Sequence, residues 1–136
     1  MMEDDRLRLL PADLAGLLAQ HGPAPTQLAA CRLAATAVDL DDDRAAQALE
    51  ALSSAGPDRT SADVSQQLAD EYDEAAWDAQ DRGSDAEYES SFRRARAAAA
   101  LAFAHRQDAS DAVYEAAHAF GDAELFAVAL RAALSM

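Results

Sequence analysis

The sequence predicts an all-α protein, a compact bundle of about six or seven helices built from helical hairpins. Three observations lead to this prediction. Of the 136 residues, 37 are alanine, which has the highest intrinsic helix propensity. Strand-favouring residues are scarce, since there is no isoleucine and only four valines. Glycine and proline separate segments in which apolar residues recur with a helical period.

The length suits one helical domain, 1–136, with a single core. Within it we expect short N-terminal helices in 1–56, a long acidic helical hairpin in 61–106 and a C-terminal helical hairpin in 109–134. The short helices are expected to form a separate layer against the long hairpin. Glycine followed by a capping residue marks the turn of each hairpin, at Gly83-Ser84 and at Gly121-Asp122.

Capping residues set the expected helix starts. Thr26 is a good N-cap for the second short helix, and Asp41 to Asp43 begin the third. Thr60 or Ser61 is expected to cap the first helix of the acidic hairpin. Ser84, with Glu87 three residues later, has the spacing of a capping box for the second helix.

Cross-helix ion pairs are expected within the acidic hairpin. Residues about ten positions from its turn come level in an antiparallel pair of helices. This register brings three arginines near four acidic residues: Arg93, Arg94 and Arg96 face Asp70, Glu71, Asp73 and Glu74. Each exposed pair is worth less than about 1 kcal/mol, so the pairs set register more than stability.

The two hairpins are punctuated alike, 38 residues apart, with small residues and a glycine turn at similar places. This arrangement faintly resembles a tetratricopeptide unit. The sequence departs from that family at Tyr88 and Phe126, where the family has alanine, and at Tyr114, where it has glycine. The N-terminal third has no matching unit. A short tetratricopeptide-like helical stack is therefore the alternative to a compact bundle.

The formal charge of −14 disfavours direct contact with nucleic acid or with anionic membranes, and favours a basic partner. No segment approaches the length of a membrane span, and Met1 to Arg8 lacks the pattern of a secretion signal. We therefore expect a cytoplasmic protein. All eleven basic residues are arginine, which together with the alanine content suggests a GC-rich bacterial genome.

Sites of chemistry are few in the sequence. Cys31 is the lone cysteine and lies on an apolar helix side, so we interpret it as a buried structural thiol. Glu115 and His118 have the ExxH spacing of carboxylate-bridged metal sites, but no second such pair exists. We expect a solvated surface pair, or a histidine packed beside Tyr114, with metal binding a minor alternative. No cofactor is expected.

Catalytic patterns are also absent from the sequence. No lysine exists for a phosphate-binding loop, and no nucleophile elbow surrounds the serines. Carboxylates are abundant, but a solvated acidic helix face supplies them without any tuned pKa. We therefore expect a protein that is not an enzyme.

The segment from Asp63 to Glu89 is the most informative part of the chain, with ten acidic residues, one arginine and the only tryptophan, Trp77. On a helical wheel Trp77 lies about 40° from the centre of the acidic face. We weigh two positions for its indole. It packs beneath the N-terminal helices with Arg93 or Arg96 over it, which we rank first, or it is an exposed anchor for a partner.

The function hypothesis follows from the exposed alternative. It is a small acidic protein-binding or regulatory module, such as an adaptor, an inhibitor or an immunity-type protein, with a basic or amphipathic protein partner. A ligand- or metal-binding bundle and a DNA-mimic inhibitor are the alternatives. A homodimer would use an apolar helix face, such as that of the final helix, because like charges repel across the acidic one. The candidate binding residues are Trp77, Asp70, Asp73, Glu74, Asp78 and Asp81.

Overall fold

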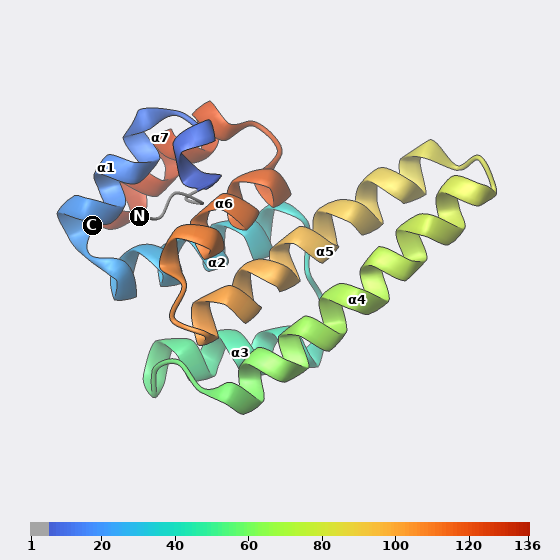
Figure 1. Ribbon diagram of the computed structural model, residues 1–136, viewed down its shortest axis with the longest axis horizontal. Coiled ribbons are helices and arrows are strands. Elements are labelled where there is room, and N and C mark those ends of the chain that lie inside the picture. Colours follow the sequence, from blue (N-terminus) through green and yellow to red (C-terminus); the bar gives the residue numbers. More distant parts are fainter. Residues whose placement is uncertain (1–5) are drawn as a thin grey trace.

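Figure 1 shows the computed structural model, which describes residues 6–136 and is entirely helical over that range apart from short connections. Seven α-helices follow a short 3-10 helix, so the prediction of an all-α bundle of six or seven helices is confirmed. Residues 1–5 lie outside the described part, and so does most of the Met1 to Arg8 segment considered above. The elements are η1 (Arg6–Leu9), α1 (Ala12–His21), α2 (Pro23–Ala37), α3 (Asp43–Ser54), α4 (Arg59–Asp81), α5 (Asp85–His105), α6 (Ala109–Phe120) and α7 (Ala123–Leu134).

The C-terminal half of α5 is the centre of the molecule. From residue 95 to residue 105, every residue except Arg96 and Phe103 is buried, and seven of the buried ones are alanine. Helices α4, α6, α2 and α3 all pack against α5. Because alanine side chains end at Cβ, neighbouring helices approach α5 closely on several sides. Across residues 6–136, no helix combines the length and the apolar character needed to cross a membrane.

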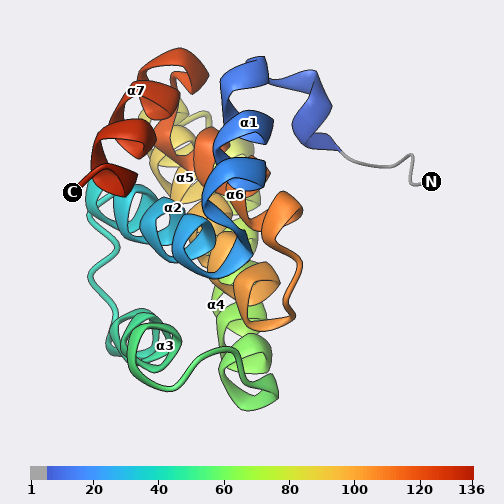
Figure 2. The ribbon, with the colours of Figure 1, turned by 90° about the vertical axis from the view of Figure 1, so that its left-hand side faces the viewer.

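The N-terminal helices lie in two places rather than in one separate layer. Helix α2 packs against α6, α5 and α7, while α1 contacts α2, α6 and α7. Helix α3 instead lies beside the first half of α4, and Figure 2 shows it at the opposite end of the body from α1 and α7, while Arg32 of α2 still bonds Ser53 of α3 (3.0 Å). In a helical stack each hairpin would contact only its neighbours in sequence. The contacts of α2 with three C-terminal helices are those of a bundle.

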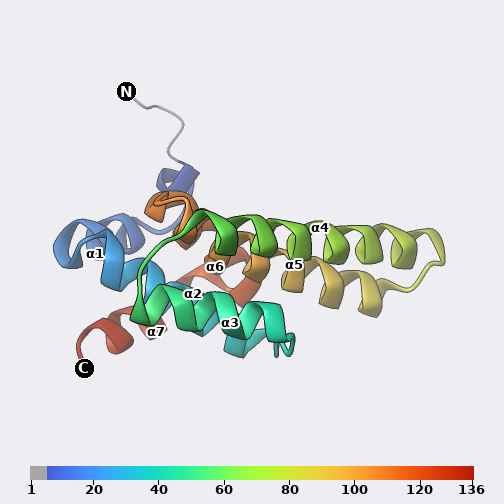
Figure 3. The ribbon, with the colours of Figure 1, turned by 90° about the horizontal axis from the view of Figure 1, so that it is seen from below.

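The distal halves of α4 and α5 project from the body as a two-helix arm, which we define as residues 70–94. Figures 1 and 3 both show this arm extending beyond the other helices. None of the residues 85–94 of α5 is buried, in contrast to residues 95–105. Between residues 70 and 81 of α4 only Ala76 and Ala79 are buried. The buried contact within the arm is therefore limited to small side chains, and Glu71 and Arg93 attach the base of the arm to α3 and α6.

Aspartates cap four of the helices, and this changes some predicted helix starts. The side chain of Asp58 accepts a hydrogen bond from the Ser61 backbone N–H, so α4 begins before the predicted caps Thr60 and Ser61. Ser84 makes no side-chain capping bond, and Glu87 is bonded to Arg82 instead (2.9 Å). The remaining capping aspartates are Asp42, Asp108 and Asp122.

Helix α2 also starts earlier than predicted. Thr26 is buried inside it, because Gly22 and Pro23 make the turn between α1 and α2. Gly22 has a φ of 88°, a left-handed conformation that glycine adopts without strain, and Pro23 suits a first helical position. The Gly-Pro pair therefore starts this helix, and the threonine that resembled a cap packs in the core.

Enlarging an alanine in the buried half of α5 should destabilise the fold. Ala100 is fully buried, and we expect Ala100→Leu to lower the free energy of unfolding by about 1 to 3 kcal/mol through overpacking. Ala86 lies exposed near the tip of the same helix, and Ala86→Leu should change stability by less than about 0.5 kcal/mol. Chemical denaturation measures both. Equal effects would contradict the central position of α5.

Candidate functional site

Trp77 lies on the outer surface of α4, in the arm, and 65% of it is exposed to solvent. The interpretation ranked first from the sequence, burial beneath the N-terminal helices, is therefore wrong. The expected cover is absent because α3 packs along the first half of α4, where Arg44 bonds Glu71 six residues before Trp77, and because α1 and α2 make no contact with α4. Arg93 and Arg96 do not cover the indole either, since each is engaged elsewhere.

The residues around Trp77 form a shallow hollow of about 410 Å³ on the outside of α4. It is lined by six side chains of that one helix, four of which are carboxylates: Gln67, Asp70, Glu71, Asp73, Glu74 and Trp77. These residues share a face because positions three and four apart on a helix are neighbours. The structure thus brings Asp70, Asp73 and Glu74 around the indole, as the sequence predicted.

Two of these carboxylates are already bonded to arginines of the fold. Asp73 pairs with Arg96 of α5 (2.9 Å), which ties the two helices of the arm together. Glu71 accepts two hydrogen bonds from Arg44 of α3, both of 2.9 Å. The hydrogen bonds from Arg44 hold the pKa of Glu71 below its ordinary value. These two acids therefore attach α4 to α5 and to α3.

The carboxylates nearer the tip have no such partner. Glu74, Asp78 and Asp81 are exposed and make no ion pair with any described residue. Asp70 accepts only a neutral hydrogen bond, from the Gln66 side chain (3.0 Å). Of the candidate binding residues, four acids therefore remain uncompensated beside Trp77, and Asp73 is partly neutralised.

The predicted ion pairs across the hairpin form only at Arg96. Arg93 turns away from α4, and its guanidinium donates to the carbonyl oxygens of Ala119 (2.8 Å) and Phe120 (2.7 Å). A cation at the C-terminal end of a helix satisfies the last carbonyls and the helix dipole. Arg94 donates to the Ser90 hydroxyl of its own helix. Sequence register could not reveal that α6 ends at the level of Arg93.

Glu115 occupies the most buried acidic position of the described chain. Only 4% of it is exposed, and its two carboxylate oxygens accept hydrogen bonds from Arg96 (3.0 Å) and Arg6 (3.2 Å). The expectation of a solvated Glu115 is therefore wrong. Its burial follows from the position of α6 between α5 and η1, and the two arginines compensate its charge.

His118 is exposed, and its ring packs on Tyr114 at a centroid distance of 4.6 Å, as the second sequence interpretation predicted. Among residues 6–136 no group of three potential metal-binding side chains is close enough to hold an ion. Since both oxygens of Glu115 already accept bonds from arginines, the ExxH spacing is explained by packing.

Arg6 makes a structural contact that sequence reasoning missed. Its guanidinium bonds Asp111 (3.1 Å to Oδ1) as well as Glu115, and lies over the Tyr114 ring at 4.3 Å from the centroid. These contacts attach η1 to α6. One feature of the sequence could have indicated this contact: a single glutamate lies on the alanine-rich face of α6, and a buried glutamate requires a cation beside it.

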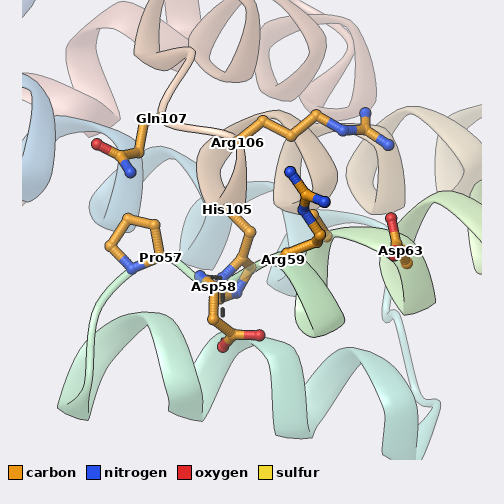
Figure 4. Close-up of a pocket in the computed structure, with 8 residues that line it drawn as sticks. Pro57, Asp58, Arg59, Asp63, His105, Arg106 and Gln107 are labelled. Carbon is orange, nitrogen blue, oxygen red and sulfur yellow. Dashed lines mark hydrogen bonds and ion pairs between the residues drawn. The ribbon is translucent and has the colours of Figure 1, made fainter.

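A pocket of about 570 Å³ lies between the start of α4 and the end of α5, and Figure 4 shows the residues that line it. His105 is buried there and links three elements. Its Nδ1 accepts a hydrogen bond from the Asp58 backbone N–H (3.0 Å), and its Nε2 lies 2.8 Å from the Ala48 carbonyl oxygen, to which it donates as the neutral tautomer. With both nitrogens engaged, His105 fastens α3 and the α3–α4 connection to α5.

Cys31 is buried in the core, as the sequence predicted. Burial raises the pKa of its thiol to about 12, so the thiolate is not formed at neutral pH. The side chain packs as a small apolar group.

Comparisons with known proteins supply no relative: no protein-family model matches the chain, and no curated protein or solved structure shows detectable similarity to it.

Removing the charge of Glu115 should destabilise the protein. Glu115→Gln leaves Arg6 and Arg96 without their shared acceptor charge, and we expect a loss of about 2 to 3 kcal/mol in the free energy of unfolding. The matched control is Asp13→Asn, which removes the exposed pair with Arg131 (3.1 Å) and should cost less than about 0.5 kcal/mol. Thermal and urea denaturation measure both, and a loss at Glu115 no larger than at Asp13 would contradict the structural role given to it.

Proposed function

We propose that this protein is a small binding or regulatory module, such as an adaptor, an inhibitor or an immunity-type protein, that receives a basic segment of another protein on its acidic arm. The observation that carries the proposal is the 65% exposure of Trp77 in the middle of a row of carboxylates. A large aromatic side chain with no cover in the free protein is the residue type that most often anchors an interface.

The charges of the arm support a basic partner. Asp70, Glu74, Asp78 and Asp81 surround Trp77 on the exposed side of α4, and none of them is neutralised by an arginine of the described chain. An arginine or lysine of a partner that lies over the indole would gain a cation–π contact and an ion pair at the same position. The overall charge of −14 would steer such a partner during encounter.

The body gives the arm a firm base. Helix α5 runs without interruption from the arm into the buried centre, and the Asp73–Arg96 and Glu71–Arg44 pairs hold α4 beside it and beside α3. A binding surface on continuous helices is presented in a defined geometry, which limits the entropy lost on binding.

Truncating Trp77 should abolish most of the partner affinity. We expect Trp77→Ala to weaken binding by about 2 kcal/mol or more, roughly thirtyfold in Kd, because the indole would be the central anchor. The stability of the free protein should change by less than about 0.5 kcal/mol, since the side chain is exposed. Capture from a lysate of the source organism, followed by calorimetric titration of the captured protein, measures the loss.

The matched control is Leu125→Ala, which truncates another exposed apolar side chain (60% exposed) on α7, in the body. This variant should bind as the wild type does. The association rate of the wild type should also fall as salt is added. A loss of binding free energy below about 0.3 kcal/mol in Trp77→Ala, or an equal loss in Leu125→Ala, would reject the arm as the binding surface.

A further inference from the structure

The Asp73–Arg96 ion pair identifies which residues of α4 and α5 share one side of the arm. The two groups bond across the helices at 2.9 Å, so they lie on the same flank at the same level. Trp77 is one helical turn from Asp73 toward the tip, and Phe92 is one turn from Arg96 in the same direction. Trp77 and Phe92 are therefore level on this flank, although 15 positions of sequence separate them.

Phe92 belongs to an apolar row on α5. Its ring is stacked with Tyr88 at a centroid distance of 6.0 Å and an interplanar angle of 20°, and the guanidinium carbon of Arg96 lies 5.4 Å from its centroid. Phe92 is nevertheless 36% exposed. The flank thus presents aromatic side chains from both helices of the arm, and no described element covers them.

Carboxylates border this aromatic strip on both sides. Glu74, Asp78 and Asp81 lie within about one turn of Trp77 on α4, and Asp85 and Glu89 lie within two turns of Phe92 on α5, all of them exposed; Glu89 also lines a hollow with Val38 and Asp39 at the end of α2. A complementary surface has an apolar centre with basic groups along both edges. The strip follows the helix axis, and Asp73 to Asp81 alone spans about 12 Å at the rise of an α-helix.

We infer that the partner element is a cationic amphipathic helix that packs lengthwise on this flank and completes a three-helix bundle with the distal halves of α4 and α5. The inference deepens the proposed function and depends on it. The charges at the edges of the strip identify the occupant as cationic, and its apolar centre requires an apolar stripe at helical spacing.

The body of the same protein shows how such a third helix packs. Helix α6 lies along the buried half of α5 and ends at the level of Arg93, beyond which the residues of α5 are no longer buried. Only Ala76 and Ala79 are buried between residues 70 and 81 of α4, and none of residues 85–94 of α5 is buried, so most of the surface of the arm is open. A third helix on the aromatic flank would bury Trp77 and Phe92 together, which neither helix of the arm achieves alone.

Two peptides of equal composition test the inference. The first is a leucine–arginine peptide of about 18 residues, roughly five turns, with leucine at three- and four-residue spacing. The second is a scrambled sequence without helical amphipathicity. Trp77 fluorescence reports binding, and circular dichroism reports the helix content. We expect the amphipathic peptide to bind at least about tenfold more tightly than the scrambled one and to become helical on binding.

The variant Phe92→Ala should weaken binding of the amphipathic peptide by about tenfold in Kd and leave binding of the scrambled peptide unchanged. Leu125→Ala should change the binding of neither peptide. Equal, salt-sensitive binding of the two peptides would overturn the helical occupant and leave the basic-partner function standing. If Phe92→Ala binds the amphipathic peptide as tightly as the wild type does, the helical occupant is likewise overturned and the basic-partner function is left standing. If neither peptide binds at low salt, both the inference and the proposed function are overturned.

Discussion

The packing of four helices around the alanine-rich half of α5 is the constraint on which the rest of the structure depends. Alanine allows these helices to approach closely, which leaves little room for long polar side chains between them. Arg96 is the only charged residue between positions 95 and 104, and it must therefore be paired. Glu115 and Asp73 supply that charge, so one arginine joins α4, α5 and α6.

The same packing decides where negative charge remains free. Arg96 pairs with Glu115 and Asp73, and Arg44 pairs with Glu71. Arg93 donates to the last carbonyls of α6. These arginines are engaged near the body, and Glu74, Asp78 and Asp81 of the arm beyond them make no ion pair with any described residue. The exposed indole of Trp77 lies among those carboxylates. The proposed binding surface therefore lies where the carboxylates around Trp77 are no longer paired with arginines of the fold.

Local signals in the sequence were sufficient to predict the helices but not to predict which side chains pack against one another. Gly83 and Gly121 ended helices as predicted, because a left-handed glycine stops a helix whatever surrounds it. Whether Trp77 is covered, whether Glu115 is buried, and which carbonyls Arg93 meets depend on where α3 and α6 lie in space. Helical periodicity fixes the direction of a side chain on its own helix and contains no information on what packs opposite it.

Because Trp77 is the only tryptophan, its fluorescence tests most directly whether the acidic arm is uncovered in the free protein. We expect red-shifted emission typical of a solvated indole, ready quenching by acrylamide, and no change in either when α7 is altered by Leu125→Ala. Blue-shifted emission that acrylamide quenches poorly would show the indole sealed in the fold or in a self-association interface, and would contradict an open acidic arm.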